Sequence, residues 1–99
     1  MSNKTETIEK INVEYAKPKL YKVILHNDNY TTMEFVVEIL MTIFHKTTID
    51  AEKIMRDVHE KGKGIVGLYP YDIAATRVIL VEQRAVESGF PLKVTMEAE

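Results

Sequence analysis

The hydrophobic positions of the chain follow two periods, and each period predicts a type of element. Residues 20–26 are mostly apolar and β-branched, which predicts a strand. The turn formers Asn-Asp-Asn at 27–29 end it. Near the other end, Leu92, Val94 and Met96 alternate with polar residues, and this period of two predicts a half-buried strand.

Two helices are predicted between these strands. Thr31 lies three residues before Glu34, the spacing of a capping box. The apolar positions behind it recur at helical intervals: Val36, Ile39, Leu40, Ile43 and Phe44. Thr47 and Thr48 are candidate N-caps for a second helix, which Gly62 and Gly64 end. The apolar stripe of this second helix is Ala51, Ile54, Met55 and Val58.

A strand and a third helix follow. The apolar run at 65–69, between glycines and Pro70, predicts a buried strand. A helix is expected from about Tyr71 to Ser88, with Gly89 as its C-terminal cap and Pro91 preventing its continuation. The apolar stripe of this helix is Ala74, Val78, Val81 and Ala85.

The resulting order, β-α-α-β-α-β, predicts an α+β domain in which three helices pack on one face of a three-stranded antiparallel sheet. With 99 residues, one domain is the expected number. Residues 1–18 mix charged, polar and isolated apolar residues and are expected to form a flexible tail. The compact domain is expected at 19–99.

Composition narrows the choice of partners. A net charge of −2 gives no electrostatic reason to expect nucleic acid or an anionic membrane as a partner. The chain has no cysteine, which removes disulfides and thiolate chemistry. It has neither an apolar run of the roughly 20 residues that span a bilayer nor a secretion signal, so a cytoplasmic location is expected.

Little in the chain suggests catalysis. The three histidines are far apart and lack partners at metal-ligand spacing. The glycines at 62, 64 and 67 lack the spacing of a phosphate-binding loop. Ser2 and Ser88 lie in the tail and at a helix end, where neither resembles a nucleophile. No catalytic residue, metal or cofactor is therefore expected.

Two polar features suggest a binding site instead. One is the loop at 27–29, and the other is His59, beside the end of an apolar stripe. Amide, carboxylate and neutral imidazole groups all accept hydrogen bonds, which beside an apolar pocket suits an alkylammonium ligand. Simpler interpretations remain open: turn and capping chemistry for the loop, a surface histidine at a helix C-terminus, and core packing for the methionines 33, 41 and 55.

The segment from Tyr21 to Val36, with its His-Asn-Asp-Asn-Tyr-Thr core, resembles the opening of the ClpS family. The similarity continues to the end of the chain through Met55, Val58, His59, Gly62, Gly67, Pro91-Leu92 and residues 95–97. The resemblance implies an adaptor without chemistry of its own. Such an adaptor binds proteins whose first residue is Leu, Phe, Tyr or Trp and passes them to the AAA+ unfoldase ClpA, through its N-terminal domain, for degradation by ClpP.

The same resemblance assigns roles to individual residues. The positions implied to bind the α-amino group are Asn27, Asp28, Asn29 and His59. Those implied to line the hydrophobic pocket are Thr31, Met33, Val36, Met55, Val58 and Leu92. Those implied to dock on the unfoldase are Asp72, Thr76 and Arg77. The chain departs from the family pattern at Asn29 and Ala75, where acidic residues are usual, and at Thr32, where proline is usual.

Two other classes of protein were weighed against an adaptor. A domain associated with RNA or the ribosome is disfavoured because the chain is slightly acidic and has no basic stripe. A hydrolase using Asp28 with His59 lacks a nucleophile.

Overall fold

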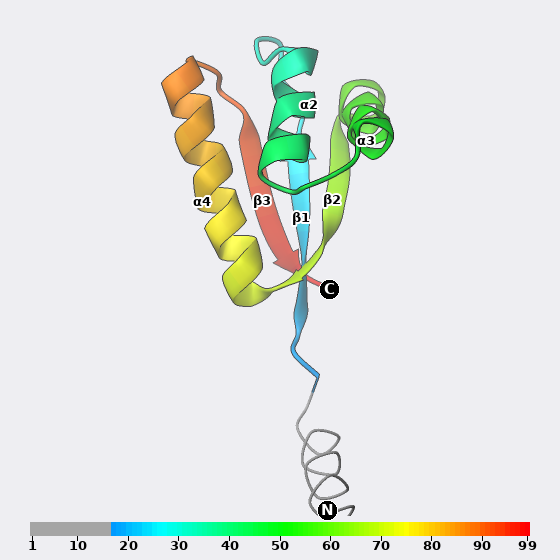
Figure 1. Ribbon diagram of the computed structural model, residues 1–99, viewed down its shortest axis with the longest axis vertical. Coiled ribbons are helices and arrows are strands. Elements are labelled where there is room, and N and C mark those ends of the chain that lie inside the picture. Colours follow the sequence, from blue (N-terminus) through cyan, green and yellow to red (C-terminus); the bar gives the residue numbers. More distant parts are fainter. Residues whose placement is uncertain (1–16) are drawn as a thin grey trace, which may run out of the picture.

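The predicted element order is confirmed. The computed structural model describes residues 17–99, so residues 1–16 of the predicted tail lie outside the described part of the chain. The elements are β1 (Leu20–His26), α2 (Met33–Thr42), α3 (Thr48–Lys61), β2 (Lys63–Pro70), α4 (Tyr71–Ser88) and β3 (Lys93–Ala98) (Figure 1).

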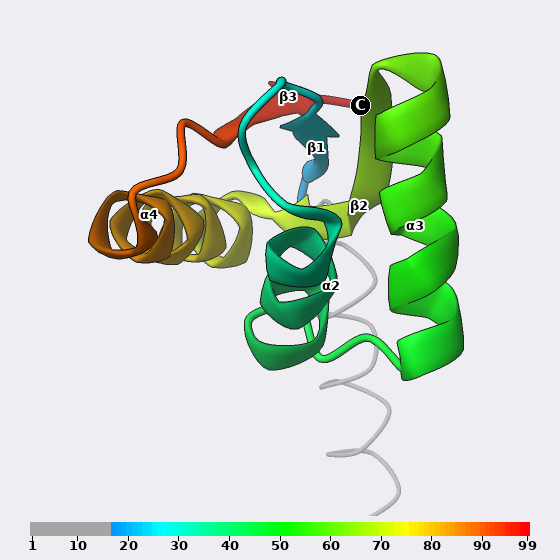
Figure 2. The ribbon, with the colours of Figure 1, turned by 90° about the horizontal axis from the view of Figure 1, so that it is seen from above.

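The three strands form one antiparallel sheet in the order β2-β1-β3. His26, the last residue of β1, pairs with Lys63 on one side and Lys93 on the other. The three helices cover one face of this sheet, as Figure 2 shows from above. The predicted α+β architecture is therefore confirmed.

The core lies between this face of the sheet and the helices. Val23 and Leu25 of the central strand are fully buried, as are Ile39 and Leu40 of α2. Each helix turns the stripe that its period predicted toward the core, with Ile54, Met55 and Val78 partly buried. The buried set includes Phe35, Val36, Ala51, Val58, Ala74, Val81 and Ala85. A packed core of this kind holds the helix ends in fixed positions relative to β1.

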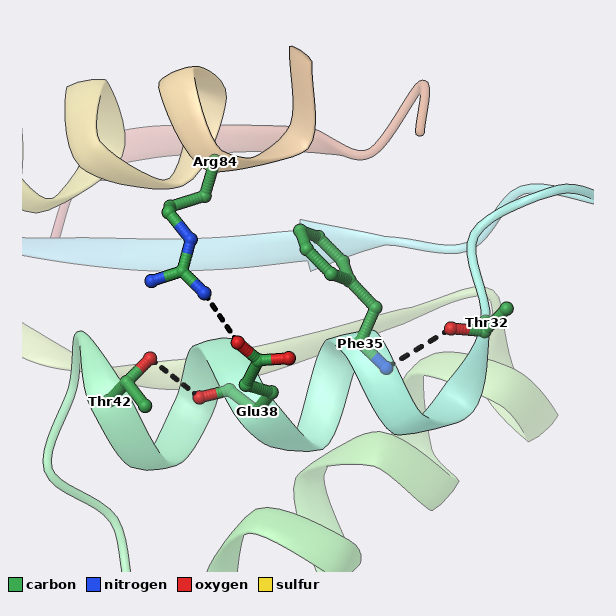
Figure 3. Close-up of polar contacts among 5 residues, drawn as sticks. All are labelled: Thr32, Phe35, Glu38, Thr42 and Arg84. Atoms are coloured by element: carbon green, nitrogen blue, oxygen red, sulfur yellow. Dashed lines mark hydrogen bonds and ion pairs between the residues drawn. The ribbon is translucent and has the colours of Figure 1, made fainter. Parts of the chain in front are cut away.

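The N-cap of α2 differs from the prediction. Thr32, not Thr31, caps the helix, and its hydroxyl oxygen accepts a 3.1 Å hydrogen bond from the Phe35 amide (Figure 3). The Thr31 side chain is turned toward Asp28 instead, to which its amide and hydroxyl both donate. The other helix ends follow the prediction, with Thr47 capping α3 and left-handed glycines closing α3 and α4.

The prediction of a strand at 65–69 is confirmed, but the expectation that this strand is buried was wrong, because only Val66 among these residues is buried. β2 lies at the edge of the sheet, and Ile65 and Leu68 are 54% and 43% exposed. Val66 lies between them, at the irregularity in the pairing of β2 with β1, and is buried in the core. The run is apolar on both faces, but the helices cover only one.

α2 is fixed against α4 as well as against α3. The Arg84 guanidinium of α4 pairs with the Glu38 carboxylate of α2, as Figure 3 shows. The rings of Phe35 and Phe90 pack 4.8 Å apart between centroids.

Within residues 17–99, no helix has the length and apolar character needed to cross a membrane.

Candidate functional site

The loop after β1 is tied to the end of α3. The backbone amide of Asn27 donates a 2.9 Å hydrogen bond to the carbonyl oxygen of Gly62, the residue with left-handed backbone conformation that closes α3. His59 lies in the last turn of the same helix. Two segments more than thirty residues apart thus meet at one end of the sheet, because the strand and the helix both terminate there.

Asp28 organises the loop. One of its carboxylate oxygens accepts from the amides of Tyr30 and Thr31, at 2.8 and 2.7 Å, and the other accepts from the Thr31 hydroxyl at 2.7 Å. Partial burial acts to raise the pKa of Asp28, but these hydrogen bonds outweigh it and hold the pKa below its ordinary value. The carboxylate is therefore ionised at neutral pH and places a negative charge in the loop.

A pocket of about 530 Å³ opens between this loop, the start of α2 and the end of α3. It brings together nine of the residues singled out in the sequence: Asn27, Asp28, Asn29, Thr31, Met33, Val36, Met55, Val58 and His59. Leu92 is not among its lining residues. That side chain is 6% exposed and belongs to the core cluster beneath the helices.

The pocket has a polar end and an apolar end. Asn27, Asn29 and His59 are exposed, so their acceptor groups are open to a ligand. Val36 and Val58 are 5% and 3% exposed and form a fixed apolar wall. Acceptors beside a rigid apolar surface suit a ligand that carries an ammonium group next to a hydrophobic substituent.

Three lining residues were not singled out from the sequence as pocket residues: Tyr30, Thr32 and Glu34. They occupy the segment in which the loop becomes α2. A signal for these three residues was present in the sequence, because they alternate with Thr31 and Met33, which were predicted to line the pocket. A tight turn exposes neighbouring residues to one cavity, which a helical or strand period does not predict.

The third group of predicted residues lies elsewhere. Asp72, Thr76 and Arg77 line a separate groove of about 450 Å³ between the end of α2 and the first half of α4, together with Thr42, Ile43, His45, Ile73 and Leu80. The Arg77 guanidinium lies 4.9 Å from the centroid of the Tyr69 ring, a cation–π contact that fixes its stem. The groove and the pocket share no residue and occupy opposite ends of α2.

Comparison with known proteins gives one family. Residues 16–95 match the family described as "ATP-dependent Clp protease adaptor protein ClpS". The ATP-dependent Clp protease adapter protein ClpS of Acetivibrio thermocellus is 61% identical over 99 residues, covering 100% of both chains. The protein of the same name from Clostridium acetobutylicum is 56% identical over 98 residues, covering 97% of both.

A solved structure is similar in fold as well as in sequence. Agrobacterium tumefaciens ClpS2 bound to L-phenylalaninamide superposes with a TM-score of 0.80 at 38% identity, covering 84% of this chain and all of that one. The fold and the preformed pocket define a small binding protein of the α+β class. The chain belongs to the ClpS family of adaptors of the ATP-dependent Clp protease, so the resemblance of its motifs is confirmed.

Proposed function

We propose that this adaptor binds the free α-amino group and the large hydrophobic first residue of protein substrates and delivers them to the ClpA unfoldase of the ClpAP protease. The first residues accepted are Leu, Phe, Tyr and Trp. The observation that carries the proposal is the union of exposed hydrogen-bond acceptors and a buried apolar wall in one pocket. A cytoplasmic location, where such delivery takes place, is part of the proposal.

The polar end suits the α-ammonium of a chain terminus. An ammonium has three N–H donors, and Asn27, Asn29 and the neutral imidazole of His59 each offer an acceptor. The Asp28 carboxylate already accepts three hydrogen bonds within its loop. Its contribution is therefore the negative charge, which favours a cation in the pocket without a direct contact.

The apolar end suits a large side chain. Val36 and Val58 supply the fixed wall, while Met33 and Met55 are unbranched and adapt to side chains of different shapes. This combination accommodates both Leu and aromatic first residues. The ligand of the Agrobacterium relative supports the proposal, because L-phenylalaninamide joins a free α-amine to a benzyl group.

Delivery needs a second contact that leaves the pocket free. The groove that contains Asp72, Thr76 and Arg77 meets this need, and we assign it to the N-terminal domain of ClpA. α2 has 10 residues and spans roughly 15 Å, so the two sites are separated by about that length. Substrate and unfoldase can then be bound at once.

The test compares a fluorescent peptide that begins with Phe with the same peptide acetylated at its N-terminus. Acetylation removes the charge and two donors, and leaves the acceptors around the pocket unpaired. Fluorescence anisotropy is expected to detect binding of the free peptide only. Equal affinity of the two peptides contradicts the amine site. A free peptide with Ala as its first residue is the control, and its weak binding shows that the apolar end contributes too.

A further inference from the structure

A second groove adjoins the pocket. It has a volume of about 480 Å³, lies between α2 and α3, and is lined by Met33, Glu34, Val37, Glu52, Met55 and Arg56. Met33, Glu34 and Met55 also line the pocket, and the two methionine side chains form the apolar part of a wall shared by both cavities. A ligand that fills the pocket and continues past this wall enters the second groove.

The groove has the composition of a recognition site. Its floor is apolar, with Met33 44% exposed and Val37 and Met55 half-buried. Its rim is charged: Glu34, Glu52 and Arg56 are exposed, and within residues 17–99 none of them belongs to an ion pair closer than 4.0 Å. An apolar centre with an open polar rim is the usual anatomy of a protein–peptide interface.

We infer that this groove is a subsite for the side chain of the third residue of the bound substrate, an inference that rests on the proposed function. In an extended peptide, alternate side chains point to the same side, and residues 1 and 3 are about 7 Å apart. Over that distance, the backbone of the peptide crosses one methionine side chain of the wall between the two cavities. With the first side chain in the pocket, the second points away from the protein and the third enters the groove.

The subsite takes a medium-sized apolar side chain such as Leu or Met. Among the apolar lining residues, Val37 lines only this groove, whereas Met33 and Met55 line both cavities. Val37 is therefore the residue whose change separates the third-residue preference from the first-residue preference. It also packs against the core, so the substitution must keep the helix intact.

Three peptides that differ only at positions 2 and 3 test the subsite: Phe-Ser-Leu, Phe-Leu-Ser and Phe-Ser-Ser, each followed by one common sequence. We expect Phe-Ser-Leu to bind about three- to tenfold more tightly than Phe-Ser-Ser. Phe-Leu-Ser is expected to bind like Phe-Ser-Ser. Equal affinity of all three peptides, or a gain from Leu at position 2, overturns the inference.

Variants then locate the gain. Val37→Ser is expected to remove the advantage of Phe-Ser-Leu, and the isosteric Val37→Thr, which keeps the side-chain volume, to reduce it. Val86→Ser is the matched control, because Val86 is 79% exposed on α4 and touches neither cavity. It is expected to retain the full advantage. An undiminished advantage in both Val37 variants, checked for folding by circular dichroism, contradicts the assignment.

The two proposals fail in different ways. If acetylated and free Phe-Ser-Leu bind equally, the amine site is wrong. If acetylation abolishes binding and position 3 has no effect, the amine site stands and the subsite alone is wrong.

Discussion

Gly64 of β2 and Val58 of α3 pack so closely that no Cβ atom fits at position 64. A Cβ there would lie 2.8 Å from Val58 Cγ2 and 3.1 Å from the carbonyl oxygen of Ile54. The glycine thus determines how deeply α3 sits on the sheet. Since Val58 and His59 both line the pocket, this packing also determines the pocket's shape.

Gly64→Ala is therefore expected to lower the free energy of unfolding by about 1–3 kcal/mol, because the helix has to move away from the strand. Affinity for a Phe-initiated peptide falls several-fold as Val58 shifts. Urea denaturation and anisotropy measure the two effects. Gly67→Ala is the control, because a Cβ there meets the Tyr69 side chain of the same strand and no atom of a helix. Equal stability and affinity of the two variants would show that the Gly64 contact relaxes easily.

His59→Ala is expected to weaken peptide binding. The imidazole offers a ring nitrogen that accepts a hydrogen bond from the ammonium, and the methyl group of alanine has no acceptor in its place. Affinity for a Phe-initiated peptide, measured by fluorescence anisotropy, is therefore expected to fall about tenfold. His45→Ala is the control, since His45 is exposed and lies outside the pocket. Equal affinity of the His59 variant and the wild type would exclude His59 from the amine site.

Asp28 links pH to stability. Its pKa in the folded protein lies below the ordinary value of 3.8, so its stabilising contribution is complete above about pH 3.8 and is lost as pH falls through the lower folded value. Asp28→Ala removes three hydrogen bonds and is expected to cost about 1–3 kcal/mol at pH 7.

The difference in the free energy of unfolding between wild type and Asp28→Ala should narrow below pH 4. Urea denaturation from pH 7 to pH 2.5 measures this difference. Glu87→Ala, an exposed substitution at the end of α4, controls for a general effect of removing a carboxylate. A difference that stays constant across this range would mean that the ionised form of Asp28 is not what stabilises the loop.

Asn29→Asp is expected to tighten binding by about 1 kcal/mol, because a carboxylate is a stronger acceptor for an ammonium than an amide. Asn29 is exposed, so the gain is larger at low salt than at high salt. It applies equally to Leu-, Phe- and Tyr-initiated peptides, which share the amine. Titration of both proteins at two salt concentrations measures it. Identical affinities at both concentrations would place Asn29 away from the amine.

Charge reversal in the groove between α2 and α4, which we assign to the unfoldase, separates binding from delivery. Asp72→Arg combined with Arg77→Glu is expected to leave peptide affinity within about twofold, because neither residue lines the pocket. Degradation of a Phe-initiated reporter by ClpAP is expected to fall to the level without adaptor. Glu87→Arg, on α4 but outside the groove, is the control. Normal degradation with the double variant would contradict the docking assignment.

The sequence by itself determined the order of the elements and most of their ends. The elements follow from local signals: the periods of the apolar residues, the N-cap at Thr47 and the glycines at 62 and 89. Such signals depend on backbone conformation and hydrogen bonds between near neighbours in the chain, so the sequence pattern predicts them. The polar loop and His59 were also visible, and the family resemblance grouped them as one site. In the structure they meet because β1 and α3 end at the same place, where the Asn27 backbone amide donates to the Gly62 carbonyl oxygen.

Only the tertiary structure decided the features for which the local sequence allows more than one outcome. Thr31 and Thr32 both precede an apolar helix, and in the structure Thr32 caps the helix while Thr31 donates to Asp28. Residues 65–69 are apolar on both faces, and the central place of β1 leaves them at an edge. Leu92 packs in the core rather than lining the pocket. Strand order and burial depend on contacts between distant segments, which no local period encodes.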